Sequence, residues 1–314
     1  MEYTILGRTG LKVSRLGLGG GGPSQLGQSS GRSEGESAAV IRQALAAGVN
    51  FIDTAEAYRT EGLIGQAIRG VPRHEVVLST KKSTWSDAQR PPITPAQLRA
   101  SLESSLQRLG TDYVDVYSLH AVEIEQYDYL LAEIVPAMQQ LQREGKVRFL
   151  GITEAFHSDT QHIMLQRALQ DDVWDVIMVG FNLLNQSARE RVLAETLRRQ
   201  IGIQIMFAVR LALSRPERLK EVIAGLIAQG QIQADEMDGD DPLGFVLQGG
   251  ALSIPDAAYR FCRDEPGTQV ILSGTGNPDH LRQNLASIAA PPLSPEVTAR
   301  LRHLFRNVDS VSGQ

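Results

Sequence analysis

The sequence predicts an α/β protein that folds as a single (β/α)8 barrel over residues 1–314. Short apolar runs rich in branched residues alternate with longer segments whose apolar residues recur at helical spacing, a pattern typical of βαβ units around a parallel sheet. Eight such runs are present, and this number favours a closed TIM barrel over an open, doubly wound sheet. A length of 314 residues also suits one barrel domain.

The predicted strands are spaced so that a helix can follow each one. They are Arg15–Gly19, Asn50–Asp53, Glu75–Thr80, Tyr113–Leu119, Val147–Ile152, Trp174–Val179, Ile203–Ala208 and Gln269–Ser273. Before them, Tyr3–Leu6 and Lys12–Val13 flank the turn sequence Gly7-Arg8-Thr9-Gly10, so we expect a β-hairpin that closes the bottom of the barrel. After the last strand we expect a C-terminal helix.

Two segments between the strands have clear signatures. Thr94 and Pro95 are the N-cap and first-turn residues of a predicted helix that ends at Gly110. The segment Gln231–Gly250 combines five acidic residues with a proline and several glycines, which is typical of an inserted loop. We expect it to form either a lid or a surface excursion.

The composition is that of an ordinary globular protein, with 42% hydrophobic and 21% charged residues and a net charge of -5. Its one cysteine, Cys262, cannot form an intramolecular disulfide, which favours a reducing compartment. The first residues do not resemble a leader, and no run of eighteen apolar residues occurs, so we expect a cytoplasmic protein without a membrane segment. Basic residues are scattered, so nucleic acid is not an expected partner. The sequence gives no indication of the oligomeric state.

Titratable residues end three successive predicted strands. Asp53, Lys81 and His120 follow the second, third and fourth apolar runs, and Tyr58 lies in the loop five residues after Asp53. Functional groups of a barrel gather at the carboxyl ends of its strands, so we expect these four side chains at one mouth. Any one of them alone is more often structural, but four at corresponding positions favour a site.

These four residue types suit proton transfer to and from a substrate oxygen. A free tyrosine has a pKa of about 10, and a neighbouring ammonium such as Lys81 is expected to lower it by roughly 1–3 units. Asp53 would keep Lys81 charged and aimed at Tyr58. A ring N–H of His120 would orient the substrate oxygen.

The same residues lie in stretches that resemble the aldo-keto reductase superfamily. The resemblance rests on Asn50–Tyr58 followed by Leu63–Ile68, on Leu78–Lys81, and on Asp115–His120, and it continues in order through nearly the whole chain. It implies that Asp53, Tyr58, Lys81 and His120 are the catalytic tetrad. Tyr58 would then be the general acid in reduction and the general base in oxidation. The implied activity is NAD(P)(H)-dependent interconversion of a small carbonyl substrate, an aldehyde, ketone or sugar-like compound, and its alcohol, without a metal.

The resemblance also implies the cofactor contacts after the last strand. They are Ser273, Gly274, Thr275, Gly276, Asn277, His280, Gln283 and Asn284, with Asn284 at the position that contacts adenine. Family habit implies NADP(H). However, Gly274, Asn277 and His280 stand where NADP-preferring members often carry Lys or Arg, which leaves NAD(H) or use of both cofactors open. Arg210 or Arg282 could replace those cations.

At the nicotinamide end, the sequence departs from the family pattern. Thr153 and Glu154 stand in place of a Ser-Asn pair, and Met178 stands in place of a glutamine. Thr153 and Glu154 could bond the carboxamide, whereas Met178 offers only a weak acceptor. Phe207 is placed to stack on the nicotinamide, although core packing explains it nearly as well.

These departures keep an alternative open, a catalytically weak nucleotide-binding sensor or regulatory subunit on the same barrel. A metal-dependent barrel enzyme is a third alternative, but the sequence has no ligand cluster with metal spacing.

Gly17–Gly22 satisfies the dinucleotide pattern G-x-G-x-x-G, yet a proline and a polar loop follow it instead of a helix, so we set this motif aside. Substrate choice is expected to depend on the loops Gly20–Glu36, Trp85–Pro92, Val122–Tyr127 and Gln231–Gly250.

Overall fold

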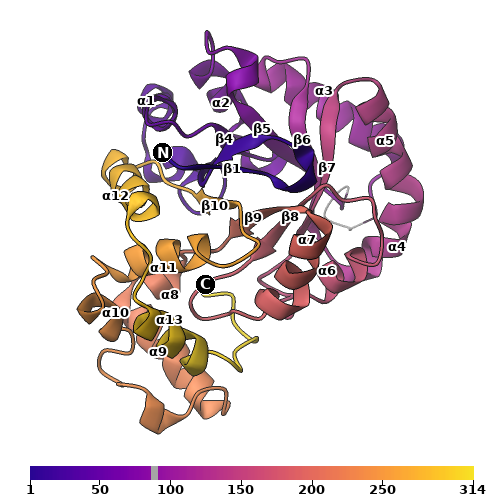
Figure 1. Ribbon diagram of the computed structural model, residues 1–314. Helices are drawn as coiled ribbons and strands as arrows, with labels where there is room; N and C mark the ends of the chain where they lie inside the picture. The colour runs from indigo at the N-terminus through magenta and orange to yellow at the C-terminus, as the bar shows by residue number, and fades with distance from the viewer. Residues whose placement is uncertain (86–90) are drawn as a thin grey trace.

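A closed barrel of eight parallel strands forms the centre of the computed structural model, which describes residues 1–85 and 91–314 (Figure 1). The strand order around the barrel is β10-β3-β4-β5-β6-β7-β8-β9. The strands are β3 (Leu16–Gly19), β4 (Phe51–Asp53), β5 (Val77–Ser83), β6 (Val114–Val122), β7 (Val147–Glu154), β8 (Val176–Gly180), β9 (Gly202–Met206) and β10 (Val270–Ser273). Each overlaps one of the eight predicted runs, so the predicted barrel is confirmed.

The predicted N-terminal hairpin is also present. Strands β1 (Tyr3–Ile5) and β2 (Lys12–Ser14) pair antiparallel, with Thr4 opposite Val13. Apolar side chains of the hairpin join the first residues of several barrel strands in a separate cluster of Leu6, Leu11, Val13, Phe51, Val77, Val116, Val176 and Val270. The contact is close: a Cβ built on Gly202, at the start of β9, would lie 2.7 Å from Leu6 Cγ. The hairpin therefore closes the bottom of the barrel.

Helices surround the barrel on its outer side (Figure 1). They are α1 (Glu34–Ala46), α2 (Glu61–Ala67), α3 (Pro95–Leu109), α4 (Tyr127–Tyr129), α5 (Val135–Arg143), α6 (Ile163–Ala168), α7 (Ala194–Arg199), α8 (Leu211–Ser214), α9 (Pro216–Ala228), α10 (Phe245–Gln248), α11 (Ile254–Arg263), α12 (Pro278–Ala289) and α13 (Pro295–Leu304). Helix α3 begins and ends as predicted, because Thr94 and Gln97 cap each other reciprocally and Gly110 adopts a left-handed conformation with a φ of 67°.

Two helices, α12 and α13, follow the last strand, where the sequence predicted a C-terminal helix. The acidic segment Gln231–Gly250 packs against this C-terminal region. Glu236 contacts His303 of α13 at 2.8 Å, and Gln231 accepts a hydrogen bond from Ser310 at 2.9 Å. None of the described residues that line the active-site cavity below comes from this segment. The segment therefore lies against α13 and the residues after it, and its role as a lid or a surface excursion stays a prediction.

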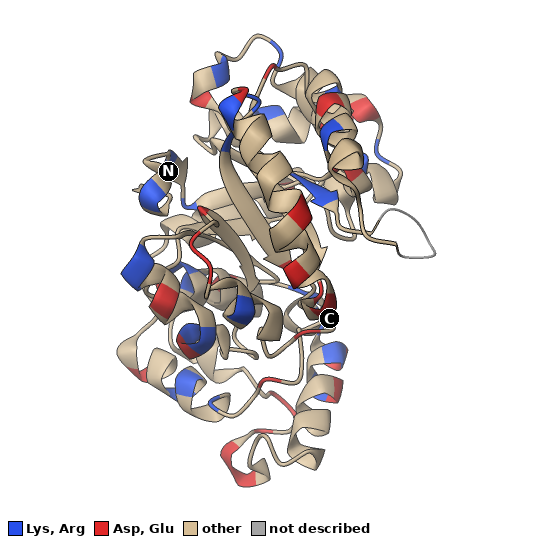
Figure 2. Ribbon diagram, turned by 90° about the vertical axis from the view of Figure 1, so that its right-hand side faces the viewer, with Lys and Arg blue, Asp and Glu red and all other residues tan. Residues whose placement is uncertain are grey.

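Apolar side chains fill the space between the strands and the surrounding helices. Figure 2 shows that acidic and basic residues lie mostly on the outer helices and loops, where the two signs are interspersed. Within the described ranges, no helix is long and apolar enough to cross a membrane. Asp53 and Lys81 are among the buried polar residues at the carboxyl ends of the strands.

Candidate active site

The structure brings the four predicted catalytic side chains together at one mouth of the barrel. Asp53 ends β4, Lys81 lies on β5, His120 lies on β6, and Tyr58 belongs to the 3-10 helix Glu56–Tyr58. Lys81 Nζ donates to Asp53 Oδ2 and to the carbonyl oxygen of Thr54, both at 2.7 Å. It lies 4.9 Å from the centroid of the Tyr58 ring. The Tyr58 hydroxyl is 3.1 Å from His120 Nε2.

Burial and charge act in opposite directions on the Lys81–Asp53–Tyr58 group. Burial alone would lower the pKa of Lys81, but the charge of Asp53 outweighs it and raises that pKa, so Lys81 stays protonated. Burial raises the pKa of Tyr58, and the opposing charge of Lys81 does not fully offset it. The expected net lowering of the Tyr58 pKa is therefore wrong, because enclosure disfavours the phenolate by more than Lys81 stabilises it.

His120 is uncharged at neutral pH. Burial, followed by the nearby charge of Lys81, lowers its pKa to about 3. A neutral imidazole has one N–H donor and one acceptor nitrogen, so it can share a hydrogen bond with Tyr58 or with a substrate oxygen. Its ring meets the Tyr58 ring edge-on, with centroids 5.2 Å apart, which fixes the direction of that bond.

The glycine-rich segment after β3 packs directly against Tyr58. A Cβ built on Gly21 would lie 2.5 Å from Tyr58 Cε2, a distance that real side chains do not adopt. The amide of Gly20 donates to the carbonyl oxygen of Asp53 at 2.6 Å, which holds the loop against the end of β4. The glycines of the G-x-G-x-x-G match therefore allow the backbone to lie directly against Tyr58. The glycine content of this segment is visible in the sequence, but its contact with Tyr58 is not.

A cavity of about 490 Å³ extends from Tyr58 to helix α12. Ten of the predicted site residues line it, namely Asp53, Tyr58, Met178, Phe207, Arg210, Gly274, Thr275, His280, Gln283 and Asn284. Sequence reasoning missed others, including Tyr259 and Gln314. Gln314 reaches the cavity from the far end of the chain, and no local pattern could have placed it there.

The remaining residues predicted after β10 shape the cavity wall from behind. Ser273 Oγ accepts a hydrogen bond from Asn284 Nδ2 at 2.7 Å, which fixes the side chain of Asn284. Asn277 caps α12 by accepting from the amide of Asp279 at 2.9 Å. Gly276 packs against residue 27, where a Cβ on Gly276 would lie 2.2 Å from Gly27 Cα. These contacts position the lining residues of α12.

Comparison with known proteins agrees with this geometry. A model described as "Aldo/keto reductase family" matches residues 15–306. The chain belongs to this family. L-galactose dehydrogenase from Arabidopsis thaliana is 36% identical over 159 residues, and the match covers 49% of this chain and 48% of that protein, about half of each. NADH-specific methylglyoxal reductase from Escherichia coli (strain K12) is 28% identical over 316 residues, covering 92% of this chain and 94% of that protein.

A solved aldo-keto reductase structure from Bacillus halodurans, in its holo form, matches with a TM-score of 0.72 at 21% identity. It covers 99% of this chain and 98% of that chain, so the likeness in fold extends over the whole barrel.

Two predicted nicotinamide contacts of this aldo/keto reductase family member are instead engaged within the protein. Thr153 Oγ1 accepts a hydrogen bond from the amide of Ala121 at 2.7 Å. Glu154 is fully buried, accepts from the amide of Gly180 at 2.8 Å and contacts His162 Nδ1 at 2.9 Å. Neither residue lines the cavity. Both lie at the end of β7, so they hold its neighbours β6 and β8 in place.

Phe207 and Arg210 lie at the cavity end of β9. Phe207 has a positive φ of 64°, an unusual conformation for a bulky residue that often marks a functional constraint. Its ring meets Phe156 edge-on at 5.5 Å between centroids. The guanidinium carbon of Arg210 lies 4.0 Å from the Phe207 centroid, within range of a cation–π contact.

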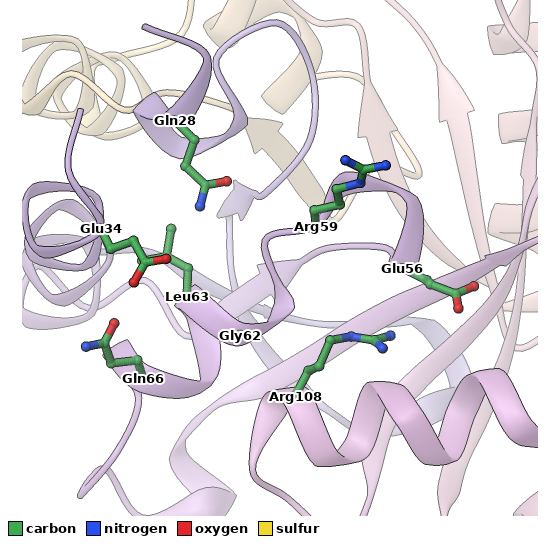
Figure 3. Close-up of a pocket in the computed structure, with 8 residues that line it drawn as sticks. All are labelled: Gln28, Glu34, Glu56, Arg59, Gly62, Leu63, Gln66 and Arg108. Atoms are coloured by element: carbon green, nitrogen blue, oxygen red, sulfur yellow. The ribbon is translucent and has the colours of Figure 1, made fainter. Parts of the chain in front are cut away.

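A second cavity, of about 460 Å³, lies beside α1 and α2 and is lined by Gln28, Glu34, Glu56, Arg59, Gly62, Leu63, Gln66 and Arg108 (Figure 3). Two of its four charged lining residues form ion pairs, Glu56 with Lys82 at 2.7 Å and Arg108 with Glu61 at 2.6 Å. Glu56 therefore belongs to this outer cavity and is not among the described residues that line the cavity beside Tyr58.

Only part of the expected substrate loops borders the active-site cavity. Gly21, Gly22 and Pro23 of the loop 20–36 line it, whereas no residue of 122–127 or of 231–250 does among those described. Most of the predicted loop Trp85–Pro92, residues 86–90, lies outside the described residues. Across residues 1–85 and 91–314, no group of three or more His, Cys, Asp or Glu side chains is arranged to hold a metal ion.

Proposed function

We propose that the protein is an NAD(P)(H)-dependent oxidoreductase that interconverts a small carbonyl compound and its alcohol, with Tyr58 as the acid and base. The observation that carries the proposal is the position of the Tyr58 hydroxyl. It borders the cavity, lies 3.1 Å from the neutral His120, and has the Lys81 ammonium beside its ring. These surroundings suit a group that gives and takes a proton.

In the reducing direction, Tyr58 donates its proton to the carbonyl oxygen. When bound, a reduced nicotinamide cofactor would supply the hydride for the carbonyl carbon. Lys81 stabilises the phenolate that remains, and its own charge is maintained by Asp53 at 2.7 Å. His120 holds the substrate oxygen by a hydrogen bond from a neutral ring. In the oxidising direction, the phenolate of Tyr58 takes the proton back.

The lining of the cavity supports the proposal that a dinucleotide binds there. Gly274, Thr275, His280, Gln283 and Asn284 would hold the adenine end, and Phe207 with Met178 would border the nicotinamide end. Thr153 and Glu154 would act through the strand ends that they fix, with Ser273, Gly276 and Asn277 supporting α12 in the same way.

We propose that NADH serves at least as well as NADPH. No lysine or arginine stands at residues 274, 277 or 280, and Arg282 is paired with Asp279 on the exposed face of α12. A 2'-phosphate would therefore find no fixed cation there. The similarity to a reductase named NADH-specific is in line with this preference. The names of the two relatives, a methylglyoxal reductase and a galactose dehydrogenase, support a small polar carbonyl or sugar-like substrate.

The proposal is tested by titrating the purified protein with NADH and with NADPH, followed by addition of methylglyoxal or 4-nitrobenzaldehyde while cofactor absorbance is monitored. We expect saturable binding and cofactor oxidation that depends on the carbonyl compound. Failure to bind either dinucleotide would overturn the enzyme proposal.

One observation favours a second candidate. Glu154 is held by His162 and Gly180, and Met178 is a poor partner for a carboxamide, so the nicotinamide end offers few polar contacts. A regulatory subunit that binds the dinucleotide with little turnover would have this property. Tight binding without oxidation across a broad panel of aldehydes, ketones and sugars would support that candidate instead.

A further inference from the structure

Gln204 of β9 carries a buried side-chain amide whose oxygen has no hydrogen-bond partner. The residue is 1% exposed, and no described residue donates to its Oε1 atom. Other enclosed amides of the chain are partnered. Asn182 Oδ1 accepts from two backbone amides at 2.9 and 3.0 Å, and Gln186 Nε2 donates to two carbonyl oxygens at 2.9 and 3.0 Å. A buried acceptor without a donor is costly, so Gln204 calls for an explanation that the scaffold does not supply.

The strand places Gln204 inside the barrel, below the active-site cavity. Successive side chains of a strand point to opposite faces, so residues two apart share a face. Gly202, two residues before Gln204, faces the N-terminal hairpin, because a Cβ there would lie 2.7 Å from Leu6 Cγ. Met206, two residues after Gln204, lines the active-site cavity. Gln204 therefore lies between the hairpin at the bottom of the barrel and the cavity at its top.

The neighbouring strands place apolar side chains around Gln204. Its Cα atom pairs with that of Met178 on β8 and with that of Val270 on β10. Met178 lines the cavity, and so does Leu272, the next residue of β10 on the inner face. Gln204 is thus a polar group at the floor of the cavity, among Met178, Met206 and Leu272. Methionine side chains adapt their shape readily, so this floor can admit a polar group of a bound molecule to the amide.

We propose that Gln204 binds the carboxamide of the nicotinamide ring, with Oε1 accepting from its NH2 group and Nε2 donating to its carbonyl oxygen. The side chains of Thr153 and Glu154 are engaged within the protein, and the Met178 thioether is only a weak acceptor. Gln204 lies in register with Met178 and has the acceptor that those three positions do not offer. An amide has one acceptor and two donors, which complement a carboxamide. The inference rests on the proposed function, which supplies the nicotinamide cofactor.

Gln204→Met tests the contact, because methionine keeps the length of the side chain and removes the amide. The matched control is Gln186→Met, which removes a buried amide that is partnered and does not line the active-site cavity. Dissociation constants are measured by calorimetry for NAD, for 3-acetylpyridine adenine dinucleotide and for ADP-ribose. The acetylpyridine analogue has a methyl group in place of the carboxamide NH2, and ADP-ribose lacks the ring. Urea unfolding without ligand gives the stability of each protein, and circular dichroism checks that it folds.

We expect wild type to bind NAD more tightly than the acetylpyridine analogue. Gln204→Met should bind NAD about 5- to 50-fold less tightly, as expected for one or two lost hydrogen bonds, and should no longer distinguish NAD from the analogue. Its affinity for ADP-ribose should be unchanged. Without ligand, its urea midpoint should rise, because an apolar side chain replaces an unsatisfied amide. Gln186→Met should show the reverse pattern, with a lower midpoint and unchanged affinities.

The contact is overturned if folded Gln204→Met binds NAD as wild type does, or still prefers NAD to the analogue by the wild-type factor. An equal loss of affinity for ADP-ribose, or a lower urea midpoint, also overturns it, because either result indicates a structural amide.

The contact and the proposed function can fail separately. Carbonyl-dependent oxidation of NADH by a Gln204→Met protein with wild-type affinities would sustain the oxidoreductase and reject the contact. A preference for NAD over the analogue that depends on Gln204, in a protein that oxidises NADH with none of the carbonyl compounds, would sustain the contact and reject the oxidoreductase. A wild-type protein that binds no dinucleotide would reject both.

Discussion

Lys81 Nζ lies 2.7 Å from Asp53 Oδ2, and the two side chains are 0% and 4% exposed. A buried pair of this kind adds little net stability, because desolvation offsets most of the attraction between the charges. Removal of one partner has a different effect, since the other charge is then left buried without a counter-charge. The pair is therefore more important for holding an ammonium beside Tyr58 than for holding the barrel together.

Asp53→Asn is expected to destabilise the protein by about 3–5 kcal/mol, because it leaves the Lys81 ammonium buried and unpaired. The double variant Asp53→Leu/Lys81→Met, which removes both charges, should recover much of that loss while staying inactive. Urea unfolding of wild type and the variants measures both effects. An Asp53→Asn protein within about 1 kcal/mol of wild type would contradict the buried charge pair.

The lowered pKa of His120, about 3 in the folded protein against an ordinary value of 6.5, gives a pH prediction. Below about pH 6.5 the unfolded chain takes up a proton on this histidine while the folded protein does not. Folding stability should therefore fall as the pH falls from about 6.5 toward 3, by at most about 1.4 kcal/mol per pH unit from this group.

His120→Gln should flatten that part of the stability profile, and His74→Gln, which changes an exposed histidine, should leave it unaltered. Chemical unfolding at a series of pH values supplies the comparison. Equal slopes for wild type and His120→Gln between pH 6 and pH 4 would show that His120 is not held neutral.

Gly21→Ala should impair turnover, because the new methyl group would lie 2.5 Å from the Tyr58 ring and displace the acid. Misplacement of a catalytic group by about 1 Å can reduce the rate on the order of 100-fold. Gly62→Ala is the matched control, since a Cβ there meets nothing within 4 Å. Steady-state kinetics give kcat for both variants. Equal kcat values for Gly21→Ala and Gly62→Ala would mean that the loop does not position Tyr58.

Glu154→Gln tests whether Glu154 acts on the cofactor or on the scaffold. Its carboxylate oxygens already accept from Gly180 and contact His162, so we expect a loss of about 1–3 kcal/mol in stability with little change in dinucleotide affinity. Calorimetric binding and thermal unfolding of the same sample separate the two roles. A large drop in affinity at unchanged stability would place Glu154 against the cofactor.

The strands and the four catalytic side chains could be predicted because both depend on local pattern. Each of Asp53, Lys81 and His120 ends an apolar run, and parallel strands bring such ends to one mouth. The Glu154–His162 contact could not be foreseen, since it requires His162 to adopt a left-handed conformation with φ 60°. The approach of Gly21 to Tyr58 and of Gln314 to the cavity likewise depends on segments that meet only in the folded chain.

Tyr58→Phe tests the central claim most directly, because it deletes one hydroxyl and leaves the ring that packs against Gly21. Single-turnover absorbance of bound NADH, mixed with a saturating aldehyde, is measured for wild type and the variant after their dinucleotide affinities have been compared. We predict nearly unchanged affinity and a rate of cofactor oxidation reduced by about 100- to 10,000-fold, the range typical of a lost general acid. A variant that oxidises NADH at the wild-type rate would contradict the assignment of Tyr58 as the proton donor.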